Sequence, residues 1–124
     1  MVEASVGRRR KRVLVVEDSF LEAEAVCGLL ADLGMEAVGP APTVAAALML
    51  IQVGNVDAAL LGIGLDRETV FPVCAPLAAR RIPFAFVTGT VNALPETLSG
   101  IPLILKPVRR TDILRILTAL LKQS

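Results

Sequence analysis

Short apolar runs alternate with longer amphipathic stretches along almost the whole chain. The first run, Val13–Val16, is brief and rich in β-branched residues, which is typical of a strand buried on both faces of a parallel sheet. Similar runs predict further strands at 36–39, 58–61, 83–88 and 103–105, with Pro40 closing the second strand. The pattern therefore indicates five strands separated by other elements.

Between the strands, apolar residues recur at helical spacing and capping residues stand at the starts. Ser19 and Thr43 are placed to cap the first two helices, and Gly34 and Gly54 are placed to end them. These signals predict helices over about 20–33 and 44–53.

The remaining helices have more mixed signals. A third helix is predicted over 69–81, where Pro72 fits the first turn and Pro76 requires a kink or an early end. Residues 89–100 predict only a short helix. Thr111 is placed to cap a last helix. Its apolar stripe consists of Ile113, Leu114, Leu117, Leu120 and Leu121.

Strands that alternate with helices over short connections predict an α/β fold, in which helices cover both faces of a parallel sheet. The 124 residues suit one domain. We expect residues 1–10 to be a disordered basic tail and residues 11–124 to form the domain. The cations at 8–12 are interpreted as a solvated tail, with contact to an acidic partner or nucleic acid as the alternative.

Composition narrows the possible functions. Hydrophobic residues make up 54% of the chain, which is enough for a full core, and the net charge of +1 makes nucleic acid an unexpected partner. The chain has no His, the commonest general base and zinc ligand, and we do not expect an enzyme. No apolar run approaches the roughly 18 residues that span a membrane, so we expect a cytoplasmic protein without membrane contact.

Polar side chains follow several of the predicted strands. Glu17 and Asp18 end the first strand, Thr88 ends the fourth, and Lys106 follows the fifth. Ligands bind outside the carboxyl ends of parallel strands, where these four residues should converge. Carboxylates suit Mg²⁺, whereas lysine and threonine suit a phosphate-like group.

The segments at 13–19 (VLVVEDS), Thr88-Gly89 and Lys106-Pro107 together resemble the response-regulator receiver domain of two-component signalling. The resemblance covers about residues 11–123. It implies a flavodoxin-like, doubly wound fold with three αβα layers and strand order 2-1-3-4-5.

The resemblance also implies roles for individual residues. Glu17 and Asp18 would form the acidic pocket that binds Mg²⁺, with a backbone carbonyl from Gly64. Thr88 and Lys106 would contact the phosphoryl group. The position of the phosphate-accepting aspartate is occupied by Gly62.

Gly62 offers no side chain to accept phosphate or to bind metal. We therefore expect no cofactor, with Mg²⁺ binding weak or absent, and we expect Lys106 to pair with Asp18 or Glu17 instead. Asp57 starts its strand and should lie at the opposite edge of the sheet. Asp66 and Glu68 lie in the following loop, from which they could reach the rim without reproducing the acceptor geometry.

Four apolar residues near the last strand and last helix are candidates for a partner interface. They are Leu103, Leu105, Val108 and Ile116. Leu103 also stands where receivers often carry an aromatic switch residue.

These observations favour a stand-alone, receiver-like signalling protein of a two-component or phosphorelay system that acts by protein contact. The expected partner is a histidine kinase or another signalling protein, with a homodimer as an alternative. Two other functions stay open: a phosphoacceptor that uses another acidic residue such as Asp18, and a small-ligand-binding flavodoxin-like domain. If the pocket is otherwise intact, Gly62→Asp should restore Mg²⁺ binding.

Overall fold

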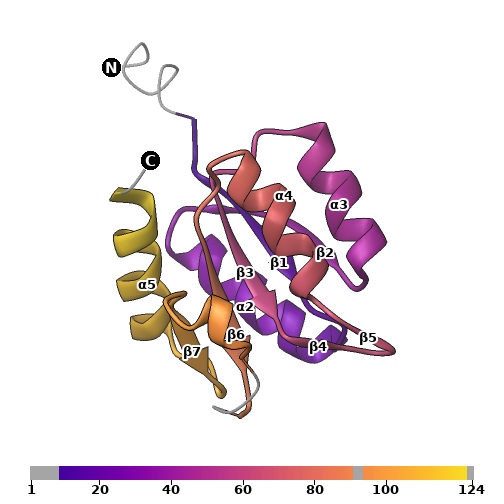
Figure 1. Ribbon diagram of the computed structural model, residues 1–124. Helices are drawn as coiled ribbons and strands as arrows, with labels where there is room; N and C mark the ends of the chain where they lie inside the picture. Colours follow the sequence, from indigo (N-terminus) through magenta and orange to yellow (C-terminus); the bar gives the residue numbers. More distant parts are fainter. Residues whose placement is uncertain (1–8, 91–93, 123–124) are drawn as a thin grey trace.

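The computed structural model describes residues 9–90 and 94–122 and contains one five-stranded parallel sheet. Its strands are β1 (Arg12–Val16), β2 (Glu36–Ala41), β3 (Ala58–Gly62), β6 (Phe84–Thr88) and β7 (Leu103–Leu105). They lie in the order β2-β1-β3-β6-β7 (Figure 1). This confirms the predicted order 2-1-3-4-5, since β6 and β7 are the fourth and fifth strands of the sheet. An unexpected antiparallel hairpin, formed by β4 (Gly64–Leu65) and β5 (Glu68–Thr69), follows β3.

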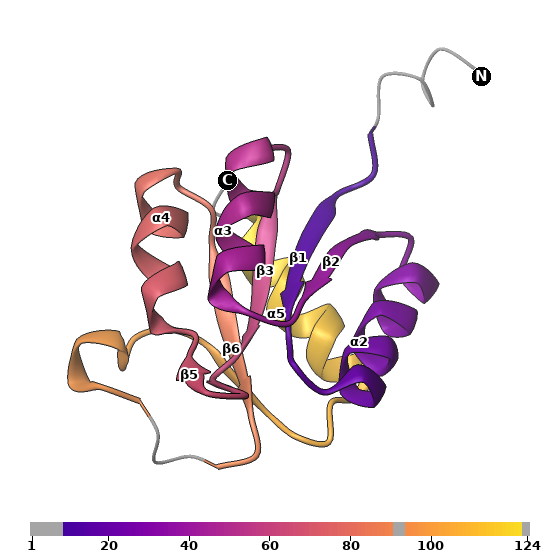
Figure 2. The same cartoon turned by 90° about the vertical axis from the view of Figure 1, so that its right-hand side faces the viewer.

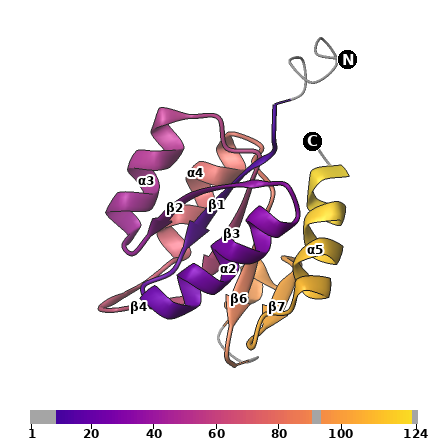
Figure 3. The same ribbon diagram turned by 180° about the vertical axis from the view of Figure 1, so that it is seen from behind.

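Helices cover both faces of the sheet, which confirms the three-layer architecture. The helical elements are α2 (Phe20–Asp32), α3 (Val44–Val53), η1 (Phe71–Val73), α4 (Cys74–Ala79), η2 (Glu96–Leu98) and α5 (Arg110–Lys122). Figure 2 shows α3 and α4 on one side of the sheet and α2 and α5 on the other. The view from behind places α2 and α5 in front of the strands (Figure 3). Each helix pair buries its apolar residues in a separate core cluster against its own sheet face.

The first two helices begin as the sequence predicts. The Ser19 hydroxyl accepts the Glu22 N–H at 3.4 Å, and the Thr43 hydroxyl accepts the Ala46 N–H at 3.1 Å. Each cap satisfies one of the amide donors that the first helical turn leaves free. The Ser19 cap also fixes where α2 starts relative to the end of β1, and this start positions the candidate site.

The capping prediction for the last helix is wrong. Helix α5 begins at Arg110, so Thr111 already lies inside its first turn. The carboxylate of Asp112 accepts the Arg109 N–H at 3.3 Å and serves the helix start instead. A carboxylate near a helix N-terminus also interacts favourably with the helix dipole.

The apolar stripe of α5 is rotated from its predicted position. Ile116, predicted to lie at a partner interface, is only 7% exposed and belongs to the core with Ile113, Leu117 and Leu120. Leu114, predicted to be internal, is 47% exposed. Both sets of residues follow three- and four-residue spacing, so packing against the sheet, and not the spacing, decides which face of α5 is buried.

The prediction for Pro40 is wrong, whereas the early end expected from Pro76 is observed. Strand β2 continues through Pro40 to Ala41, so Pro40 does not close it. Because β2 is an edge strand, a missing N–H is tolerated there, and the register between β2 and β1 shifts at this point. The third helix does not start at Thr69, which lies in β5, but at Phe71 as a short 3-10 turn. It then ends at Ala79, which fits the early end expected from Pro76.

At the amino edge of the sheet, Arg12 joins several segments. Its guanidinium pairs with Glu36 and donates to the Asn55 carbonyl at 2.8 Å, while its backbone N–H donates to the Asp57 carboxylate at 2.8 Å. Arg9 lies 3.8 Å from the same Asp57 carboxylate. Residues 1–8 of the predicted tail lie outside the described residues. In the basic run that follows, Arg9 and Arg12 make the contacts given above. Among the described residues, no helix has the length and apolar character needed to cross a membrane.

Candidate functional site

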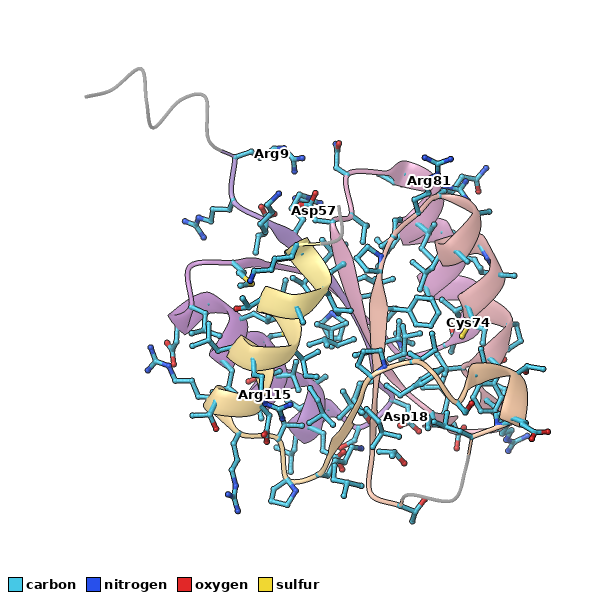
Figure 4. All side chains as sticks on the ribbon, turned by 60° about the vertical axis from the view of Figure 1, so that its left-hand side comes forward. Arg9, Asp18, Asp57, Cys74, Arg81 and Arg115 are labelled. Carbon is cyan, nitrogen blue, oxygen red and sulfur yellow. The ribbon has the colours of Figure 1, made fainter. Side chains whose placement is uncertain are left out.

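The carboxyl edge of the sheet brings Glu17, Gly62, Thr88 and Lys106 together, because these residues end or follow neighbouring parallel strands. The backbone N–H of Lys106 donates to the backbone carbonyl of Thr88 at 2.8 Å, and this hydrogen bond holds the end of β7 against the end of β6. Figure 4 shows Asp18 at this edge and Asp57 at the opposite one, as the sequence predicts. The predicted polar residues therefore share one edge.

Glu17 is the buried carboxylate of this edge. Its side chain is 7% exposed, accepts the Ser19 N–H at 3.1 Å and lies 3.3 Å from the Lys106 ammonium. A Cβ atom built on Gly62 would be 2.8 Å from Glu17 Oε1 and 3.2 Å from the Val16 carbonyl oxygen. The Glu17 carboxylate therefore lies where a side chain at position 62 would begin.

Lys106 pairs with a second carboxylate that the sequence analysis missed. Glu22, in the first turn of α2, forms an ion pair with the Lys106 ammonium and is 49% exposed. The sequence offered one indication of this role: Glu22 lies three residues after Ser19, the predicted cap of the helix that follows the first strand. Of the two partners predicted for Lys106, Glu17 is confirmed and Asp18 is not paired with it; Asp18 is exposed.

The electrostatics of the pair follow from burial and contact. Burial raises the pKa of Glu17, although the Ser19 N–H and the Lys106 charge oppose the increase. Burial lowers the pKa of Lys106, but the hydrogen bond to Glu22 and the charge of Glu17 outweigh it, so that the net pKa is raised. Lys106 is therefore a charged ammonium at neutral pH.

Other predicted residues lie nearby without joining the ion pairs. Thr88 is buried, and its hydroxyl accepts the Thr90 N–H at 3.3 Å. Asp66 is exposed beside Arg67 in the β4–β5 hairpin, and the Glu68 carboxylate accepts the Val44 N–H at 2.9 Å at the start of α3. Neither hairpin carboxylate takes the place of the missing acceptor.

Comparison with known proteins places this architecture. No protein-family model matches the sequence, and no curated protein matches it. Among solved structures, SdrG from Sphingomonas melonis Fr1 is 36% identical, with a TM-score of 0.82 over 90% of this chain and 97% of SdrG. The BeF3-activated conformation of SdrG is 37% identical, with a TM-score of 0.77 over 89% of this chain and 95% of that one. A CheY-like response regulator receiver domain protein from Methanospirillum hungatei JF-1 is 25% identical, with a TM-score of 0.81 over 93% of this chain and 97% of that one.

This chain belongs to the response-regulator receiver family. The fold of this receiver and the convergence of its strand ends agree with the motif resemblance, and the family gives it a role as a signalling domain. The identity of residue 62 and the ion pairs around it are features of this chain.

The acidic pocket of this receiver does not fit Mg²⁺. A divalent cation needs several oxygen ligands, but the acceptor position has no carboxylate and the Glu17 carboxylate already contacts Lys106 and the Ser19 N–H. Within residues 9–90 and 94–122, no group of three or more His, Cys, Asp or Glu residues is arranged to hold a metal ion. No buried side-chain polar atom in this described part lacks a hydrogen-bond partner. The polar groups of the pocket therefore have their hydrogen-bond and ion-pair partners within the described part of the chain.

The candidate interface of this receiver is partly exposed. Leu105 on β7 and Leu114 on α5 are each 47% exposed, whereas Leu103 and Val108 are half-buried. Next to them, a cleft of about 490 Å³ separates α2 from the connection between β7 and α5. Lys106 and Glu17 line this cleft together with apolar side chains. Of the four predicted residues Leu105 is exposed, and Leu114 takes the place of Ile116 as the exposed apolar residue of α5.

Proposed function

We propose that this receiver is a signalling protein of a two-component system that acts by binding another protein and does not accept a phosphoryl group at position 62. One observation carries the proposal: Glu17 Oε1 lies 2.8 Å from where the Cβ of residue 62 would be. The acceptor carboxylate is missing from the sequence, and the space that it would enter contains the carboxylate of another residue.

The chemistry of phosphorylation supports the same conclusion. Formation of an aspartyl phosphate requires a carboxylate nucleophile, together with cations that neutralise the phosphoryl oxygens. Gly62 provides no nucleophile, and Lys106 is already paired with Glu17 and Glu22. Asp18 is the alternative acceptor, but it does not contact Lys106 and would have to serve as nucleophile and metal ligand at once.

We propose that the partner is a histidine kinase or another signalling protein and that binding uses the exposed surface of β7 and α5. Leu105 and Leu114 are the large apolar side chains exposed there. An exposed apolar surface often marks a protein contact, and β7 and α5 are consecutive elements of the sheet and helix layers. Since position 62 carries no acceptor, we expect binding to be independent of phosphoryl donors.

A labelling experiment tests the chemical part of the proposal. The purified protein is incubated with acetyl phosphate and Mg²⁺, and SdrG, for which a BeF3-activated conformation is known, is the reference receiver. We expect no hydroxylamine-sensitive phosphoryl label on this chain. A label would contradict the proposal, and peptide mapping would show whether Asp18 carries it.

A binding experiment tests the interaction part. Histidine kinases and other receivers from the source cell are offered to the wild type and to a Leu105→Lys/Leu114→Lys variant, with Met49→Lys as control because Met49 is also exposed, but on α3. We expect the double variant alone to lose binding, with no effect of acetyl phosphate. Equal binding by all three proteins would reject this surface, and binding that requires acetyl phosphate would reject the phosphate-independent mode.

A further inference from the structure

We infer that Lys106 is the built-in counter-ion of the acidic pocket and takes the place of a divalent metal, with Glu22 as an additional carboxylate of this pocket. We refer to Glu17, Glu22 and Lys106 as the ion triad. The inference deepens the proposed function, since it describes how a pocket without an acceptor is held together. It concerns metal and stability, and its tests require no phosphorylation and no partner.

The contacts support a counter-ion role. The Lys106 ammonium pairs with Glu22 and lies 3.3 Å from Glu17 Oε1, so one cation touches two carboxylates. Only 28% of the Lys106 side chain is exposed, which limits screening of these pairs by water. A divalent cation that binds both carboxylates would have to displace this ammonium.

The space around Gly62 supports the same arrangement. A side chain at position 62 would require the Glu17 carboxylate to shift, because its Cβ would lie 2.8 Å from Glu17 Oε1, and this carboxylate is held by the Ser19 N–H and the Lys106 ammonium. Glu17 follows β1 in the chain, and its carboxylate uses the space beside Gly62 at the end of β3. Gly64, two residues later, has no atom within 4 Å of its built Cβ, so of these two neighbouring glycines only Gly62 lies in a tight space.

The ion triad connects three segments that are distant in the sequence. Glu17 follows β1, Glu22 lies in the first turn of α2, and Lys106 follows β7. These contacts span the floor of the cleft between α2 and the β7–α5 connection. The inference is therefore that the chain holds this part of the carboxyl edge in one arrangement, without metal and without phosphate.

Metal titration of a lysine variant is the first test. Mn²⁺ and Mg²⁺ are titrated by calorimetry into the wild type, Lys106→Met and Lys11→Met; the last makes the same chemical change at the opposite edge of the sheet. We expect Lys106→Met to bind divalent cations about tenfold more tightly than the other two, because its carboxylates lose their cation. Equal affinity of Lys106→Met and the wild type would overturn the inference.

Glycine variants provide a second test that does not depend on Lys106→Met folding. We expect Gly62→Ala to lower the melting temperature by several degrees and Gly64→Ala to leave it nearly unchanged. In a Glu17→Ala background, where the carboxylate is removed, Gly62→Ala should lose most of its effect. The inference is wrong if Gly62→Ala and Gly64→Ala behave alike, or if Glu17→Ala does not relieve the effect. Neither outcome decides whether the protein is phosphorylated, so the failures of the two proposals remain distinguishable.

Discussion

The two edges of the sheet each contain a cation that pairs with a carboxylate from a different segment, yet the two arrangements differ in burial. At the amino edge, Arg12 pairs with the half-exposed Glu36, and Asp57 accepts a backbone N–H. At the carboxyl edge, Lys106 pairs with the buried Glu17, which lies in the space of a missing side chain. Arg12 pairs with a half-exposed carboxylate, whereas a side chain at position 62 would have to displace the Glu17 carboxylate of the ion triad.

The Arg12–Glu36 pair is an exposed structural ion pair, whereas the ion triad belongs to the candidate functional pocket. Exposed ion pairs contribute little to stability, because water screens them and their side chains lose freedom. A buried carboxylate, by contrast, is costly to leave unpaired, so removing its partner has a large effect. The comparison predicts that equivalent changes at the two edges have unequal consequences.

The largest effect is expected for Gly62→Asp, which forces a second carboxylate into the space of Glu17. We expect a loss of about 3 kcal/mol in the free energy of unfolding, from steric overlap and from two adjacent buried charges. Urea denaturation at pH 7 measures this loss, with Gly64→Asp as control. On this account Gly62→Asp does not restore Mg²⁺ binding, contrary to the expectation for an otherwise intact pocket. A stable variant that binds Mg²⁺ would contradict it.

Removing the two cations compares the edges directly. Lys106→Met should cost about 2 kcal/mol at pH 7, because it leaves Glu17 buried without its ammonium. Arg12→Met should cost about 1 kcal/mol, because Glu36 is exposed to water and Asp57 keeps its backbone donor.

The pH dependence of this cost checks its cause. Burial raises the pKa of Glu17 above its ordinary value of 4.5, so folding favours the protonated form of this carboxyl. The deficit of Lys106→Met should therefore shrink as the pH falls toward 4.5, whereas the deficit of Arg12→Met should not. Urea unfolding of both variants at pH 4.5–8 measures this, and parallel curves would argue against a buried Glu17 charge.

Alkaline pH should weaken only the carboxyl edge. Because the pKa of Lys106 is raised, its contribution to stability is complete below about pH 10.5 and is lost as the pH rises through the folded-state value. Arginine side chains in general do not lose their charge in this range. Burial also raises the pKa of the Cys74 thiol to about 11, so the measurement uses a Cys27→Ala/Cys74→Ala background. We expect the free energy of unfolding to fall by about 1 kcal/mol at alkaline pH, and we expect no such fall when Lys106→Met is added. If the fall is the same with Lys106→Met, a group other than Lys106 causes it.

The smallest effect is expected for Asp18→Asn. Asp18 is exposed and lies outside the ion triad, so the change should alter the free energy of unfolding by less than about 0.5 kcal/mol. Glu17→Ala serves as the comparison within the same acidic pair and should change stability measurably more. Equal effects of the two substitutions in thermal unfolding would remove the distinction between the two carboxylates.

The sequence by itself determined the sheet and the content of its carboxyl edge. Short β-branched runs and the Ser19 and Thr43 caps are local signals, and they predicted the strands and the first two helices. The order of the strands came from the resemblance to receivers. Because parallel strands end at the same edge, the positions of Glu17, Thr88 and Lys106 in the chain were enough to bring them together. The missing acceptor at Gly62 was visible from the motif alone.

Only the tertiary structure decided which of these residues touch. Glu17 and Asp18 are neighbours in the chain, but Glu17 is buried against Lys106 and Asp18 is exposed. Their positions in the sequence do not indicate which of the two carboxylates is buried. Glu22 enters the pocket because the side chain of Lys106, which follows β7, reaches the first turn of α2, a long-range contact without a local signal. The same reason applies to α5, where packing against the sheet buries Ile116 and exposes Leu114. Local pattern fixes which elements form, whereas the contacts between elements depend on how their faces meet across long stretches of chain.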